Sequence, residues 1–149
     1  MSRDQQSLLA GRSTVPLSEA QVKSVTQTFI GLDQTVPFQH DPDGRTRFSV
    51  HDEEGVDVGR VYFGPDIYPG QGVADPNSAL SMKAAVAHEI SHFHRWQDQT
   101  ELPHGHNGHL DEAMTSIDAS LRFAGQLSPH EIQQLIRDSL QRIQLHLNE

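Results

Sequence analysis

The residues of this chain best suited to chemistry lie in the segment VAHEISHFHRW, residues 86–96. Within it, His88, Glu89 and His92 match the spacing H-E-x-x-H. Residues four apart share one face of an α-helix, so both imidazoles can point at a single metal ion. Glu89 is offset by one residue and can approach a water on that ion without being a ligand. Zinc lowers the pKa of such a water to about 7, and the carboxylate can take its proton as the water attacks a carbonyl.

A catalytic zinc site of this type needs a third protein ligand and an open fourth position. Glu112 lies twenty residues (112 − 92) beyond His92 and falls in a segment that predicts the next helix. The intervening sequence LPHGHNGH allows that helix to turn back and pack across the first. The helix dipole alone also favours a carboxylate in a first turn, and Asp111 would suit that role equally well. The remaining candidates for the third ligand are His104, His106, His109 and Asp111.

A further group should stabilise the negative charge that develops on the attacked carbonyl oxygen. His109 is the first candidate for this catalytic role, because it lies three residues before Glu112 and on a similar helical face. His94 lies two residues after His92, so it should face away from the site. The alternatives to His109 are His106, Tyr62 and Tyr68.

The segment HEISH followed by HLDEAMTSIDA resembles the gluzincin group of zinc metallopeptidases. In thermolysin-like members of that group, a glutamate in an N-E-A-type segment at this spacing is the third ligand, and DEAMTS matches it at Glu112 and Ala113. The longer segment DEAMTSIDASLRFAGQLSP is also similar to the ImmA/IrrE group of small HExxH proteins. The resemblance covers roughly residues 82 to 130. It implies Glu89 as the general base and Zn²⁺ held by three ligands, His88, His92 and Glu112.

One position departs from the thermolysin-like pattern. The aspartate that lies four residues after the glutamate ligand is Ser116 here, and that aspartate would orient a ligand histidine. Asp118 or a backbone carbonyl could take its place. The resemblance also implies an antiparallel edge strand beside the active-site helix, which pairs with an extended peptide, and residues 56–63 are the natural candidate.

The length and composition of the chain predict one domain, residues 1–149, with a flexible stretch over residues 1–16. The formal net charge of −9 argues against direct binding of nucleic acid or of an anionic membrane. There is no cysteine, which excludes disulfides and zinc–thiolate sites. The first thirty residues lack the pattern of a secretory signal, so a cytoplasmic location is expected.

The first half of the chain predicts a helix and a hairpin. Ser18 and Gln21 form a capping-box pattern before a helix over 19–30, for which Gly31 is a plausible stop. Two strands of a β-hairpin follow. Gly59 breaks the alternation of the second strand and would permit a bulge there. The two strands are predicted over residues 47–51 and 56–63.

The second half predicts three helices. The HEISH helix should span residues 76–97, capped by Asp75 with Pro76 in its first turn. The next helix begins near Leu110 and ends near Gly125. The last helix carries a capping box at its start together with a first-turn proline. The residues that form this start are Ser128, Pro129 and Glu131.

Together these elements predict an α+β fold, and the resemblance implies a minimal zincin-like domain. A small antiparallel sheet and the first helix would pack against the HEISH helix, followed by two further C-terminal helices. The function expected is a zinc-dependent endopeptidase that hydrolyses peptide bonds of a protein or peptide partner. The alternative is a non-catalytic metal-stabilised binding or regulatory module of the same fold. The ImmA/IrrE resemblance would also suggest a peptidase-like regulator that works with a transcription factor. The Leu and Ile stripe of the last helix could close the core or bind a second copy.

Overall fold

The computed structural model describes residues 11–70, 80–103, 105 and 108–149. These residues form an α+β fold that consists of a three-stranded sheet, four α-helices and a short 3₁₀ helix, η1. None of the described helices is long and apolar enough to cross a membrane. The elements in chain order are α2 (Glu19–Leu32), β1 (Phe38–His40), β2 (Arg47–Glu53), β3 (Val56–Phe63), η1 (Pro65–Ile67), α3 (Met82–Gln97), α4 (His109–Arg122) and α5 (Pro129–Leu147).

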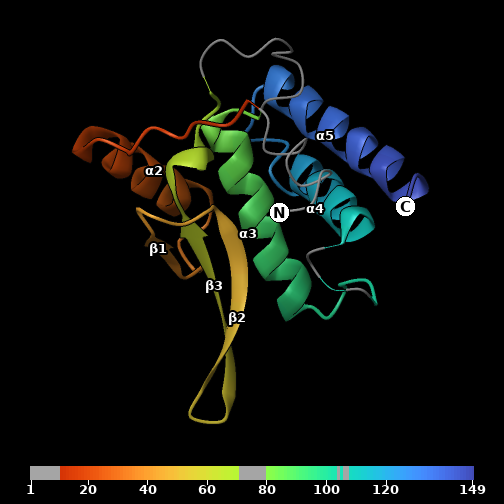
Figure 1. Ribbon diagram of the computed structural model, residues 1–149, viewed down its shortest axis with the longest axis horizontal. Coiled ribbons are helices and arrows are strands. Elements are labelled where there is room, and N and C mark those ends of the chain that lie inside the picture. Colours follow the sequence, from red (N-terminus) through yellow and green to blue (C-terminus); the bar gives the residue numbers. More distant parts are fainter. Residues whose placement is uncertain (1–10, 71–79, 104, 106–107) are drawn as a thin grey trace.

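Helix α3 is the central element of the fold. The sheet and α2 lie on one side of it, and α4 and α5 pack side by side on the other (Figure 1). Its N-terminal half is rich in alanine, which favours a helix and lets neighbouring elements approach closely. Ten of its sixteen residues are buried, so the HEISH segment lies between two layers and not on a solvated face.

The hydrophobic core joins the sheet to α2 and α3. Phe29 of α2 stacks on Phe38 of β1 with ring centroids 4.5 Å apart, and Phe63 of β3 packs beside both. Val61 and Ile90 are fully buried in the same cluster. This core holds α3 against the sheet and therefore positions the two histidines of HEISH relative to the strands.

The sheet is mixed, and the prediction of a purely antiparallel sheet was wrong. β2 and β3 form the predicted antiparallel hairpin, but β1 pairs with β3 in parallel, and the strand order is β1-β3-β2. β1 is only three residues long and lies among turn residues, too short to show an alternating pattern. Residues 56–63 are therefore the central strand and not the edge strand expected from the resemblance.

Gly59 does not form a bulge. The pairing of β2 with β3 continues through it without a shift, with Val50 opposite Gly59. A Cβ at this position would lie 2.7 Å from the Trp96 ring and 2.9 Å from the Phe48 ring. Glycine is needed here because α3 and β2 side chains press directly on the backbone of the strand.

The helix boundaries differ from the predictions in three places. Helix α2 continues to Leu32, so Gly31 does not end it. Helix α3 begins at Met82, because the Ser81 side chain caps it by accepting the Ala84 N–H, and Leu80 is not helical. Helix α4 ends at Arg122, short of the predicted Gly125. The predicted cap of α3 at Asp75 and Pro76 lies outside the described residues.

The capping boxes of α2 and α5 are confirmed. Ser18 and Gln21 exchange their side-chain and backbone hydrogen bonds at the start of α2, and Ser128 and Glu131 do the same for α5. Within the stretch predicted to be flexible, the Arg12 guanidinium donates hydrogen bonds to the carbonyls of three residues, which ties that part to the body. These three residues are Asp66, Ile67 and Leu80.

Candidate metal centre

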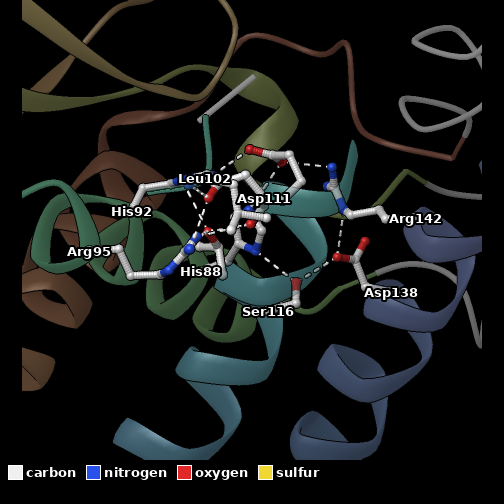
Figure 2. Close-up of polar contacts among 10 residues, drawn as sticks. His88, His92, Arg95, Leu102, Asp111, Ser116, Asp138 and Arg142 are labelled. Carbon is white, nitrogen blue, oxygen red and sulfur yellow. Dashed lines mark hydrogen bonds and ion pairs between the residues drawn. The ribbon is translucent and has the colours of Figure 1, made fainter. Parts of the chain in front are cut away.

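His88 and His92 lie one turn apart on the buried face of α3. Each side chain is only 3% exposed, and the two ring centroids are 4.7 Å apart with the ring planes at 84°. Figure 2 shows the two side chains and the polar groups around them. The predicted convergence of two imidazoles on one side of the helix is therefore confirmed.

Glu112 reaches both histidines from the first turn of α4. Its Oε1 lies 2.5 Å from His92 Nε2, and its Oε2 lies 3.3 Å from His88 Nε2. One potential ligand atom from each of the three residues can be chosen so that all lie within 4.8 Å of one another. Two imidazoles and one carboxylate at these separations form a donor set of the kind that binds zinc.

The carboxylate of Glu112 is held in its ionised form. Burial by itself would raise the pKa of Glu112. Electrostatic attraction to His92 and Arg142, with hydrogen bonds to both histidines, outweighs burial and holds that pKa well below its usual value. An ionised carboxylate is the form that coordinates a metal ion.

Glu89 lies beside His88 on α3, and its carboxylate is near the side chains of His92, Glu112 and Arg142. Its Oε2 is buried and has no hydrogen-bond partner among the described residues. Burial raises the pKa of Glu89 to about 7, and the nearby charge of Glu112 adds to this rise, while His92 and Arg142 oppose it. A carboxylate with a pKa near 7 and an unused oxygen is suited to accept a proton at neutral pH.

His88 is oriented by a serine and an aspartate from two other helices. Its Nδ1 lies 2.8 Å from Ser116 Oγ, and the Ser116 hydroxyl donates to Asp138 Oδ2 at 2.6 Å. Since the carboxylate can only accept, the serine hydrogen points to Asp138, and His88 Nδ1 must be the donor to the serine oxygen. Nε2 is then the ring nitrogen of His88 that faces Glu112, and it is the one that would bind a metal ion.

This arrangement corrects the prediction about the missing aspartate. Asp118, which was one expected substitute, instead pairs with Arg122 one turn later on the outside of α4, at 3.0 Å. The backbone carbonyl that was the other option is not the partner of His88 Nδ1 either. Ser116 is the partner of His88 Nδ1, and its hydroxyl in turn donates a hydrogen bond to Asp138 of α5.

Arg142 joins Asp138 to Glu112. Its Nη1 lies 2.6 Å from Glu112 Oε2 and its Nε lies 2.7 Å from Asp138 Oδ2, and Figure 2 shows the guanidinium between α4 and α5. Burial alone would lower the pKa of Arg142, but the two carboxylates raise it, so the side chain stays charged. One cation thus pairs with two carboxylates at the edge of the site.

His92 is held by the sheet on one side and by α4 on the other. The Phe48 ring of β2 stacks on it, with centroids 6.3 Å apart and planes at 8°. Its Nδ1 lies 3.3 Å from Thr115 Oγ1, and the Thr115 hydroxyl itself donates to the Asp111 carbonyl. The threonine oxygen therefore accepts from Nδ1, which again leaves Nε2 for Glu112.

Asp111 is not a ligand in this arrangement. Its carboxylate forms an ion pair with Arg95 at 2.8 Å and accepts the Leu102 N–H at 2.8 Å. Arg95 also donates to Thr115 Oγ1 and to the Thr100 carbonyl. The cluster ties the end of α3 to the start of α4 and to the loop between them.

The other candidate side chains that the structure describes are His94, His109, Tyr62 and Tyr68. His94 faces away as predicted and pairs with Asp33, the C-cap of α2, at 2.5 Å. His109 Nε2 lies 3.8 Å from Glu149 Oε1. The role of His109 in stabilising the oxyanion stays a prediction. Tyr62 lies 3.1 Å from His51, and burial raises the pKa of Tyr68. Two further candidates, His104 and His106, lie outside the described residues.

Sequence reasoning missed Asp138 and Arg142. The available signal was their position on α5, three and seven residues after the fully buried Leu135, which places two charged residues on the core face of an amphipathic helix. Comparison of the chain with models of protein families, with curated proteins and with solved structures found no match.

Proposed function

We propose that this protein is a zinc-dependent endopeptidase with a minimal zincin-like fold, which cuts an extended segment of a protein or peptide. The observation that carries the proposal is the convergence of His88, His92 and Glu112, with their ligand atoms within 4.8 Å, beside the unpartnered Oε2 of Glu89. Two neutral imidazole nitrogens and a carboxylate oxygen are an established catalytic zinc set. The residues present therefore fit the metal.

When bound, zinc supplies a Lewis acid that makes a water nucleophilic near neutral pH and polarises the carbonyl of the peptide bond. Glu89 accepts a proton from the attacking water at Oε2, and then donates it to the nitrogen as the C–N bond breaks. Ser116 and Thr115 hold the Nδ1 atoms of the two histidines, so that both Nε2 atoms face Glu112. Glu89 is thus the general base and afterwards the general acid.

The substrate would lie along β2. This strand is at one end of the sheet order and has β3 as its neighbour, so its outer edge can pair with an extended chain. Phe48 of β2 stacks directly on His92, which places this edge strand next to the ligand histidines. We therefore assign to β2 the role that the sequence prediction gave to residues 56–63.

The test combines metal content with peptide cleavage. Purified wild-type protein should hold about one zinc per chain and cleave an unfolded protein or a quenched-fluorescence peptide library. Glu89→Gln should keep the zinc and lose cleavage by about 10²–10⁴-fold, the usual contribution of a general base. His94→Ala is the matched control, because that histidine is on the same helix but pairs with Asp33.

Two outcomes would contradict the proposal. Zinc that is bound equally well after both His88 and His92 are replaced by alanine would place the metal elsewhere. Zinc held at this site without any cleavage by the wild type would favour the non-catalytic, metal-stabilised module instead.

A further inference from the structure

Two charged residues of α5 contact the candidate metal centre from outside the ligand set. Asp138 and Arg142 are one helical turn apart and form an ion pair at 2.7 Å. Their side chains are 8% and 14% exposed, so both charges are largely removed from water. Buried charges of this kind require partners, and the partners here lead to two of the three ligand residues.

One route runs from Asp138 to His88. The aspartate accepts the Ser116 hydroxyl at 2.6 Å, and Ser116 accepts the His88 Nδ1–H at 2.8 Å. A carboxylate at the end of such a chain fixes the tautomer and the ring orientation of the histidine, and makes Nε2 a better ligand. The contribution of Asp138 is therefore made through Ser116 and not by direct contact with His88.

The other route runs from Arg142 to Glu112. The guanidinium binds Glu112 Oε2 at 2.6 Å, while Glu112 Oε1 is the oxygen that lies 2.5 Å from His92. The two oxygens of this carboxylate are thus distinguished by their surroundings. Arg142 also binds the same Asp138 oxygen that accepts the Ser116 hydroxyl, so the two routes meet.

We propose that Asp138 and Arg142 are positioning residues, through which the packing of α5 sets the orientation of His88 and Glu112 as metal ligands. The inference rests on the proposed function, since it presumes that these ligands bind zinc. By thermodynamic reciprocity, zinc that binds more tightly when α5 is packed must also hold α5 more firmly in place. The C-terminal helix α5 contributes no ligand, but its Asp138 and Arg142 then support the ligands of the metal site.

The test measures zinc affinity by competition with a chromogenic chelator. Asp138→Asn and Arg142→Lys should each weaken zinc binding by about 10–100-fold, the range found for partners of metal ligands. The matched controls are Asp118→Asn and Arg122→Lys, which change an exposed Asp–Arg pair of the same i,i+4 spacing on α4. The controls should change zinc affinity by less than about twofold, because exposed pairs of this kind contribute little.

A third variant separates positioning from folding. Ser116→Ala leaves the Asp138–Arg142 pair intact and removes the link to His88, so the variant should fold and still bind zinc more weakly. In cobalt-substituted protein, Asp138→Asn and Ser116→Ala should alter the d–d absorption spectrum, which a purely structural role would leave unchanged. In the wild type, zinc should slow amide hydrogen exchange in α5.

The failures of the two proposals are distinguishable. Wild-type protein that binds no zinc would overturn the proposed function and this inference with it. Wild-type protein that binds zinc at the triad, while Asp138→Asn, Arg142→Lys and Ser116→Ala bind it with unchanged affinity, would overturn the positioning role alone.

Discussion

Two neighbouring carboxylates in the first turn of α4 have different surroundings. Asp111 faces Arg95 and the Leu102 amide, and it is 1% exposed. Glu112, the next residue, faces His88, His92 and Arg142. The first carboxylate has one cation and a backbone amide, as expected of a group that holds two helices and a loop together. The second lies among groups that all compete for its two oxygens.

The difference teaches which of two equivalent sequence candidates lies beside the two histidines. Both residues are acidic, and both are placed near the positive end of the helix dipole. Adjacent positions on a helix point about 100° apart, so only one of them can face α3 at the level of the two histidines. The same geometry directs the other toward Arg95. The predictions below separate the proposed metal-binding role of Glu112 from the structural role proposed for Asp111.

The largest effect is expected for Glu112→Ala. Removal of a direct ligand should weaken zinc binding more than the 10–100-fold loss that follows from changing an indirect partner. Chelator competition on the folded variant measures this affinity. Zinc affinity equal to that of the wild type would show that Glu112 is not the third ligand.

Asp111→Asn should destabilise the protein and leave the metal site in place. Loss of this charge leaves Arg95 buried without its carboxylate, which costs about 3–5 kcal/mol when one partner of a buried pair is removed. Urea denaturation of the metal-free protein gives the free energy of unfolding. The folded variant should still take up one zinc, and a folded variant without zinc would reverse the roles given to the two carboxylates.

Glu89→Gln should stabilise the metal-free protein at neutral and higher pH. The pKa of Glu89 is raised by burial from 4.5 to about 7, so folding disfavours its ionised form. The contribution of protonated Glu89 to the free energy of unfolding is fully present below pH 4.5. It is lost as the pH rises through 7. The variant should therefore gain about 3 kcal/mol at pH 8 and nothing at pH 4, measured by denaturation in the presence of a chelator. A gain that does not depend on pH would contradict this origin.

Asp33→Asn should give the smallest effect, with the opposite dependence on pH. Burial would raise the pKa of Asp33, but hydrogen bonds from Thr35 and His94 and the charge of His94 lower it. Its contribution to stability is present above the unfolded pKa of about 4 and is lost as the pH falls through the folded value. We expect a loss of about 1 kcal/mol at pH 6 that disappears near pH 2. A loss of zinc in this variant would mean that His94 and Asp33 are not separate from the site.

Much of the fold could be predicted because its signals are local. Ser18 with Gln21 and Ser128 with Glu131 mark helix starts within four residues, and the antiparallel hairpin shows in the alternation of its strands. β1 could not be predicted in this way. Three residues carry no period, and its parallel pairing depends on β3, about twenty residues further along the chain.

In the candidate site, too, the residues with a local sequence signal could be predicted, and those linked only through space could not. The i,i+4 spacing of His88 and His92 is a local signal, and Glu112 followed from the need for a third ligand. Asp138 and Arg142 could not be found from the motif, because their link to it runs through space from a different helix. Ser116 seemed a defect in the sequence, and only the position of Asp138 shows how a serine can serve there.

The most direct test of the account is anomalous X-ray diffraction at the zinc edge from crystals grown with zinc. The account predicts one strong peak about 2.0–2.2 Å from His88 Nε2, His92 Nε2 and a carboxylate oxygen of Glu112. Glu89 should lie beside this peak without contacting it as a ligand. A peak on other residues, or no peak in protein shown to be folded, would contradict the central claim.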